Sequence, residues 1–91
     1  LKEVAKFPQL TNLQLTGSQI TDGGLKEVAK MNQLTSLDLR ETQITDGGLK
    51  ELTKLKKLEM LLLFYTKVTN AGVDALKKAL PRCTIYHNAK K

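Results

Sequence analysis

The chain has 91 residues, 41% of them hydrophobic, so it forms at most one domain whose core depends on well-ordered apolar positions. Lysine and arginine exceed aspartate and glutamate by 15 to 9, and the formal charge of +6 favours solubility or an acidic partner. The single cysteine, Cys83, excludes an intrachain disulfide framework. No apolar run is long enough for a membrane span, so we expect a soluble chain without a membrane partner. Its compartment stays open, with the cytoplasm slightly favoured.

A fixed repeat period organises the sequence. The stretch LTSLDLRETQITDGGL at 34–49 has a close copy at 10–25 and a looser copy at 58–73. A constant spacing of this size is typical of stacked repeats. We therefore expect one repeat domain over 1–91, with repeats at 1–24, 25–48 and 49–72 and a C-terminal capping repeat at 73–91. Leu1 has the same place in its repeat as Leu25 and Leu49, so we expect the chain to be the end of a longer array of repeats.

Each repeat is expected to contain a helix of two to three turns. Leu25, Val28 and Ala29 recur at helical spacing, and the same pattern occupies 1–9 and 49–57. Thr45 is a good N-cap, and the following Asp46 suits the helix dipole. The second glycine of TDGG is kept in all three copies, whereas the first becomes Ala71 in the third copy. This difference predicts a close approach between neighbouring helices at the second glycine.

A short strand is expected to follow each helix. Leucines alternate with other residues in LTNLQL, LTSLDL and LEMLLL, so they face one side of each strand. Stacking copies that all run in one direction places the strands in a parallel sheet with helical crossovers. The sequence therefore predicts an α/β right-handed solenoid, with strands on its concave face and helices on its convex face.

The last segment departs from the period in its apolar spacing. Leu80, Cys83 and Ile85 reproduce the spacing of three earlier leucines, Leu58, Leu61 and Leu63, but two residues early. We therefore predict a shortened final turn in a repeat that closes the stack.

The spacing LxxLxLxxN/CxL occurs in all three copies: at Leu10, Leu13, Leu15 and Ile20, at Leu34, Leu37, Leu39 and Ile44, and at Leu58, Leu61, Leu63 and Val68. In this pattern the chain resembles the leucine-rich-repeat family, particularly the helix-bearing subclass with ribonuclease-inhibitor-like and F-box-associated repeats. It departs from the family at the N/C position, where Ser18, Thr42 and Thr66 can still satisfy a backbone group through a hydroxyl. The resemblance implies protein recognition through the concave strand face.

The residues between the strand leucines are expected on the concave face: Asn12, Gln14, Thr16, Ser36, Asp38, Arg40, Met60, Leu62, Phe64, Arg82, Thr84 and Tyr86. Met60, Leu62 and Phe64, with Tyr65 adjacent, form an apolar row on a face that is otherwise polar. This row is either a recognition surface or is covered, by the parent protein or by the tail around Tyr86 and His87. Asp38 and Arg40 either steer a partner by charge or form a solvated pair.

Catalysis and nucleic-acid binding find little support. His87, the only histidine, lies in a polar terminal segment, and Cys83 has the phase of a buried core residue. No catalytic, metal-binding or cofactor motif occurs, so we expect no enzyme, no metal and no cofactor. The excess positive charge lies in 50–57 and near the C-terminus, but two tyrosines, two phenylalanines and no recognised motif argue against nucleic acid.

The sequence therefore predicts a non-catalytic protein–protein interaction module. Met60, Leu62 and Phe64 would be anchors on the concave sheet, with Asp38, Arg40 and Tyr86 at the rim. The alternative is a structural capping or scaffold segment that self-associates through the strand edge at 11–16. The chain would then be a monomer or a weak edge-to-edge dimer.

Overall fold

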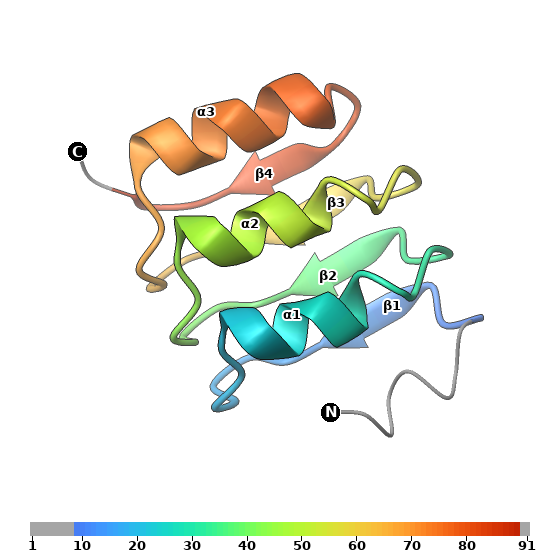
Figure 1. Cartoon of the computed structure of the whole chain (residues 1–91), viewed down its shortest axis with the longest axis horizontal. Coiled ribbons are helices and arrows are strands. Elements are labelled where there is room, and N and C mark those ends of the chain that lie inside the picture. Colours follow the sequence, from blue (N-terminus) through green and yellow to red (C-terminus); the bar gives the residue numbers. More distant parts are fainter. Residues whose placement is uncertain (1–8, 90–91) are drawn as a thin grey trace.

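Short strands and helices alternate along residues 9–89, the part of the chain that the computed structural model describes (Figure 1). The elements are β1 (Asn12–Gln14), α1 (Asp22–Val28), β2 (Ser36–Asp38), α2 (Asp46–Leu52), β3 (Met60–Leu62), α3 (Asn70–Ala79) and β4 (Thr84–Tyr86). The strands form one parallel sheet in the order β1-β2-β3-β4, and the helices cover one face of it. This is the predicted α/β solenoid. The helix predicted within 1–9 lies outside the described residues.

Each strand pairs with its neighbour at an offset of one repeat. Leu37 lies opposite Leu13 on one side and Leu61 on the other, as the period predicts. Main-chain hydrogen bonds extend the pairing past the strands: the N–H of Leu15 donates to the carbonyl of Asp38 over 2.8 Å. The repeat length therefore sets the register of the sheet.

The predicted shortening of the final turn is wrong. Ile85 pairs with Leu61, so the same offset continues to the last strand. The apolar spacing gave a wrong register because α3 has ten residues where α2 has seven. The extra helical residues replace a stretch of loop. Pro81 disfavours helix at the residue before it, which fits the end of α3 at Ala79. Thr84 and Tyr86 therefore lie opposite Met60 and Leu62, and Arg82 precedes the strand.

The core lies between the helices and the sheet and consists mainly of leucines. Leu37, Leu39, Leu61 and Leu63 are buried from the sheet side, and Leu25, Val28, Leu52 and Leu76 are buried from the helix side. Cys83 is buried at the edge of this core, although in the observed register it corresponds to the exposed Glu59, and burial raises the pKa of its thiol to about 11. A thiol with so high a pKa is a poor nucleophile at neutral pH.

Threonine hydroxyls satisfy backbone groups at the turns. Thr45 Oγ1 accepts a hydrogen bond from the N–H of Gly47, and Thr69 Oγ1 accepts one from Gly72, both over 3.2 Å. Thr21 also occupies an N-cap position but forms no such bond. At the family's N/C position, the Thr42 hydroxyl donates to the carbonyl of Leu39 over 2.8 Å. The Thr66 hydroxyl donates to Leu63 in the same way, over 2.9 Å. Threonine thus performs the expected role there.

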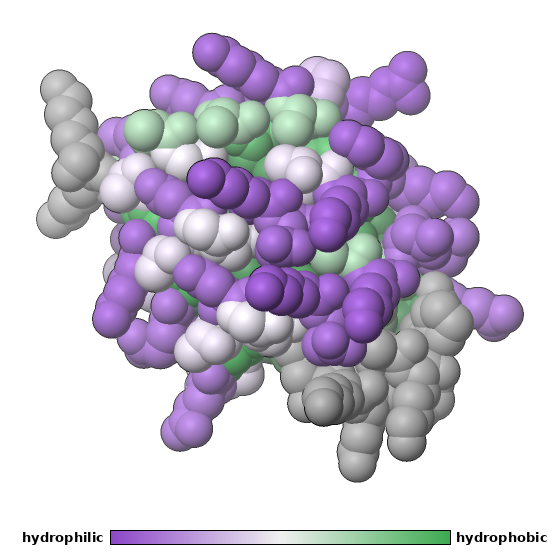
Figure 2. Space-filling model, viewed as in Figure 1, coloured by the Kyte–Doolittle hydropathy of each residue, from purple (hydrophilic) through white to green (hydrophobic). Residues whose placement is uncertain are grey.

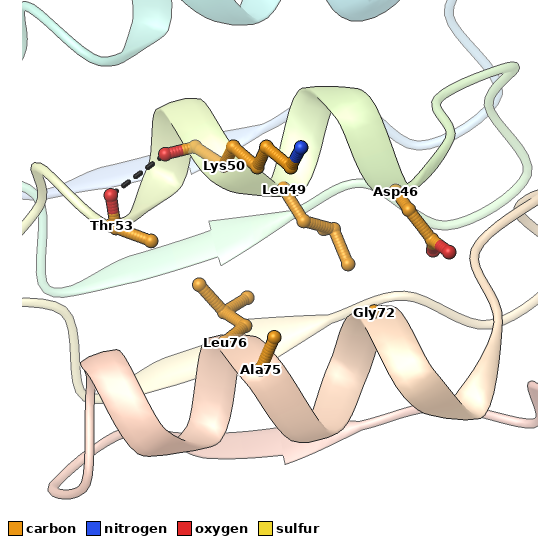
Figure 3. Close-up of a pocket in the computed structure, with 7 residues that line it drawn as sticks. All are labelled: Asp46, Leu49, Lys50, Thr53, Gly72, Ala75 and Leu76. Carbon is orange, nitrogen blue, oxygen red and sulfur yellow. Dashed lines mark hydrogen bonds between the residues drawn. The ribbon is translucent and has the colours of Figure 1, made fainter.

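The aspartate that begins α1 or α2 also binds the next repeat. Asp22 accepts hydrogen bonds from the N–H and the hydroxyl of Thr45 over 2.8 and 2.5 Å. Asp46 accepts the corresponding bonds from Thr69 over 2.8 and 2.6 Å. In Figure 3 the Asp46 side chain points from the start of α2 toward the start of α3. We call each set of contacts an aspartate link. The sequence predicted only a favourable charge at the helix terminus.

The second glycine of TDGG lies against the aspartate link. A Cβ atom at Gly48 would overlap Asp22 Oδ1 and would lie 2.7 Å from Leu25 Cδ1. A Cβ atom at Gly72 would overlap the Asp46 carboxylate in the same way. At Gly47 the nearest atom would be Asp22 Oδ2 at 3.4 Å, an ordinary contact. The predicted constraint on the second glycine is confirmed, and the neighbour is a side chain rather than a helix backbone.

Candidate functional site

One side of the sheet carries no helix within the described residues, and we call it the open face. It corresponds to the predicted concave face, and the residues that alternate with the buried leucines lie on it. Three strands in succession present different pairs there: Ser36 and Asp38, then Met60 and Leu62, then Thr84 and Tyr86. Because the pairs are in register, each is flanked by its counterparts on the neighbouring strands.

An apolar row follows β3 on the open face and consists of Met60, Leu62 and Phe64. The Met60 side chain is large and hydrophobic, yet the residue is 42% exposed. Leu62 and Phe64 are half-buried. Tyr86, opposite Leu62 on β4, is 44% exposed and widens the row by one aromatic ring. The structure therefore brings four of the six predicted partner-binding residues together on two adjacent strands.

The described part of the C-terminal tail runs beside the apolar row. β4 pairs with β3 edge to edge, and Asn88 Oδ1 accepts a hydrogen bond from the N–H of Tyr65 over 3.0 Å. Met60 and Tyr86 nevertheless keep large exposed fractions. Cover by the tail, one of the two kinds of cover that the sequence leaves open, is therefore not seen within residues 9–89.

Tyr65 extends the apolar surface beyond the end of β3. It is 70% exposed, and its ring centroid lies 6.5 Å from that of Phe64. Its φ of 62° is in the left-handed region, where Gly17 has a φ of 73° in the first copy. Glu41, at the same position in the second copy, has a φ of 58°, so this conformation belongs to the turn of each copy. The predicted site did not include Tyr65, although its adjacency to Phe64 was a signal for it in the sequence.

Asp38 and Arg40 form a tight ion pair on the open face. The Asp38 carboxylate accepts from Arg40 Nε over 2.9 and 3.1 Å and from Nη2 over 2.7 Å. Asp38 is only 5% exposed, whereas the Arg40 side chain is 44% exposed. The hydrogen bonds from the Arg40 side chain lower the pKa of Asp38 to about 2, against the opposing effect of burial. Asp38 thus lies beneath Arg40, and only Arg40 is available to a partner.

The contribution of this pair to stability is expected to fall as the pH drops from about 4 to about 2. The pKa of Asp38 is about 2 in the folded chain and has an ordinary value of 3.8. The unfolded chain therefore binds the proton first, so the contribution is complete above the ordinary pKa and is lost through the folded pKa. Urea unfolding of wild type and Asp38→Asn at several pH values will measure it. A stability difference that stays constant down to pH 2 would contradict the assignment.

The helix side offers less for recognition. Figure 2 shows mainly hydrophilic side chains on this side, with some hydrophobic surface over α3. A cavity of about 100 Å³ lies between α2 and α3, lined by Asp46, Leu49, Lys50, Thr53, Gly72, Ala75 and Leu76 (Figure 3). Ala75, which lines this space, occupies the place that Glu51 has in the preceding copy.

His87 and the possible metal ligands are the remaining polar groups of interest within residues 9–89. His87 is half-buried, and its Nδ1 accepts a hydrogen bond from the N–H of Ala89 over 3.1 Å. Over residues 9–89, no group of three or more histidine, cysteine, aspartate or glutamate side chains is placed to hold a metal ion. None of the helices in that range combines the length and the apolar character needed to cross a membrane.

Comparison with known proteins identifies the repeat. A family model described as a leucine-rich repeat matches residues 8–29 and 30–53, just over half of the chain. The chain belongs to the leucine-rich-repeat family. No curated protein matches this leucine-rich-repeat chain in sequence.

Solved structures of leucine-rich-repeat proteins share the fold. The chain is similar to a leucine-rich-repeat protein of Leptospira interrogans, with a TM-score of 0.64 and 25% identity over 93% of this chain. It is also similar to an internalin of Listeria monocytogenes, with a TM-score of 0.61 and 21% identity over 100% of this chain. The match covers 27% of the first protein and 33% of the second. This leucine-rich-repeat chain therefore spans about a third or less of their lengths.

Proposed function

We propose that this leucine-rich-repeat chain is a non-catalytic module that binds a protein partner through its open face. The apolar row supports this proposal most directly, because three adjacent hydrophobic side chains share a face with polar neighbours. Exposed apolar surface rimmed by polar groups is typical of interaction sites on soluble domains. Family membership supports the same general role, since leucine-rich repeats commonly present one sheet face for recognition.

The row has the character of a binding hot spot. Binding hot spots are rich in aromatic residues and lie at the centre of an interface, surrounded by groups that exclude water. Leu62 lies at the middle of the row, with Phe64 and Tyr86 beside it and polar side chains on the neighbouring strands. We therefore assign Met60, Leu62 and Phe64 as anchors, with Arg40, Tyr65 and Tyr86 around them. Asp38, expected at the rim, instead supports Arg40 from below.

Leu62→Glu is expected to weaken binding at least tenfold, because it places a charge at the centre of the apolar contact, and tenfold corresponds to about 1.4 kcal/mol. The probe is a library of short random peptides displayed on phage and selected on the wild-type protein. The affinities of the enriched peptides are then measured by fluorescence polarisation. Circular dichroism of each variant establishes that the fold is retained.

Asn12→Glu is the matched control for Leu62→Glu. Asn12 is exposed on β1 and is in register with Ser36, so it lies on the open face away from the row and is not in register with Asp38. The control therefore adds the same charge to the open face, and we expect it to bind like wild type. If Leu62→Glu binds the peptides within twofold of wild type, the row is not the anchor.

A further inference from the structure

The Arg40 guanidinium has hydrogen-bond donors that Asp38 does not use. A guanidinium carries five N–H groups in a rigid planar fork. Asp38 accepts from Nε and from one N–H of Nη2. No other acceptor for this guanidinium is found within residues 9–89, and the Arg40 side chain is 44% exposed. Both N–H groups of Nη1 and the second N–H of Nη2 are therefore unused. One N–H of Nη1 and the unused N–H of Nη2 point the same way and form an edge that a carboxylate accepts in bidentate fashion.

Asp38 holds this edge in a fixed place. It is nearly buried, contacts two nitrogens of the guanidinium and also accepts the main-chain N–H of Arg40 over 3.1 Å. An arginine ordered in advance loses less side-chain freedom when it binds a ligand. Asp38 is therefore a positioning residue, and Arg40 is the contact residue.

The strand that carries Asp38 and its bound guanidinium pairs with the strand of the apolar row. Arg40 and Phe64 hold equivalent positions in successive copies, and the N–H of Glu41 donates to the carbonyl of Phe64 over 2.9 Å. Neighbouring strands in a sheet are about 4.8 Å apart. The guanidinium is bound to Asp38, which is in register with Leu62, so a carboxylate on its unused edge would lie within one or two side-chain widths of Leu62. An acidic group and an apolar group on one partner segment can reach both places together.

We propose that the open face recognises a protein segment in which an aspartate or glutamate side chain binds Arg40 while a neighbouring apolar side chain packs on Phe64 and Leu62. This inference rests on the proposed function and names the chemistry of its partner. Asp38 offsets most of the Arg40 charge locally, so selectivity comes from directed hydrogen bonds. The formal charge of +6 on the chain favours the approach of an acidic segment.

The peptide library tests the inference when it is selected on wild type, Arg40→Gln and Arg82→Gln. Arg82→Gln makes the same charge change at an exposed arginine that precedes β4. We expect peptides from wild type and Arg82→Gln to be enriched in an acidic residue close to an apolar residue. Peptides from Arg40→Gln should lose the acidic enrichment and keep the apolar one.

Affinities of one enriched peptide then identify the pair of interacting groups. Replacing its acidic residue by the corresponding amide should weaken binding to wild type about tenfold and leave binding to Arg40→Gln nearly unchanged, as a double-mutant cycle requires for a direct contact. Arg40→Lys should also weaken binding, because lysine cannot form the fork. Asp38→Asn should weaken binding about threefold although it removes a negative charge, which a purely electrostatic role for Arg40 would not produce.

The outcomes separate this inference from the proposed function. If the enriched peptides are apolar without an acidic residue, and Leu62→Glu still abolishes their binding, the inference is overturned and the proposed function stands. If Arg40→Gln and Arg82→Gln change peptide binding equally, or if Asp38→Asn binds more tightly than wild type, the inference that Asp38 positions Arg40 for a carboxylate is also overturned. If no peptide is enriched on wild type, or if the enriched peptides bind Leu62→Glu as tightly as wild type, both proposals are wrong.

Discussion

Gly48→Ala is expected to lower the free energy of unfolding by about 2 kcal/mol, the usual cost of an extra methyl group in a packed site. The added Cβ atom would overlap Asp22 Oδ1 and crowd Leu25. Relief requires the Asp22 carboxylate to move, but its hydrogen bonds to Thr45 hold it in place. Since 1 kcal/mol shifts the melting temperature of a small domain by roughly 4–8 °C, a fall of about 10 °C should be seen by circular dichroism.

Gly47→Ala is the matched control, because it makes the same change one residue earlier in the same helix. A Cβ atom there would make only ordinary contacts, and the third copy already has Ala71 at this position. We expect no loss of stability and a gain of up to about 0.5 kcal/mol from the higher helix propensity of alanine. Equal melting temperatures for the two variants would show that the contact between Gly48 and Asp22 does not constrain the fold.

Asp46→Ala is expected to lower the free energy of unfolding by about 2–3 kcal/mol, since a hydrogen bond to a charged group contributes about 1.5–3 kcal/mol. The substitution removes both acceptors of Thr69, which lie within 2.8 Å of their donors. Thr69 is half-buried, so water replaces these bonds only in part. The loss is a large share of the roughly 5–15 kcal/mol that stabilises a typical domain. Urea unfolding followed by circular dichroism measures it.

Asp74→Ala provides the comparison for Asp46→Ala. Asp74 is exposed on α3 and takes part in none of the side-chain hydrogen bonds or ion pairs found within residues 9–89. Its loss should change stability by no more than about 0.5 kcal/mol, as for most surface substitutions. Asp46→Asn should lie between the two, because one amide oxygen can still accept from Thr69. If Asp46→Ala and Asp74→Ala unfold at the same urea concentration, the link adds nothing to stability.

The repeat period was sufficient to predict the architecture, because it sets the strand register directly. Leu13, Leu37 and Leu61 were assigned to equivalent places from their spacing, and they pair as predicted. The prediction for the last copy is wrong because apolar spacing alone does not distinguish a longer helix from a shorter loop. Ile85 accordingly pairs with Leu61 rather than with the leucine two residues later.

The contacts between repeats could not be predicted from the pattern. An aspartate that recurs at a helix start is explained by its favourable interaction with the helix dipole. Its hydrogen bonds to the next repeat depend on where Thr69 lies in space. The same limit applies to the site. Spacing put Asp38 and Arg40 on one side of one strand, but only the structure shows the guanidinium folded over the carboxylate. The exposed row itself was visible in the sequence as Met60, Leu62 and Phe64 among polar counterparts.

The aspartate link also has a direction. One repeat supplies the carboxylate, and the next supplies the threonine donors and the glycine that makes room for it. The two surfaces of a repeat are therefore different, which makes the contact heterologous, and a heterologous contact continues unless its geometry closes into a ring. The link itself sets no limit on the number of repeats. Duplicating residues 25–48 in place would give the extra unit a matching neighbour on each side, so the same chemistry can build solenoids of different lengths.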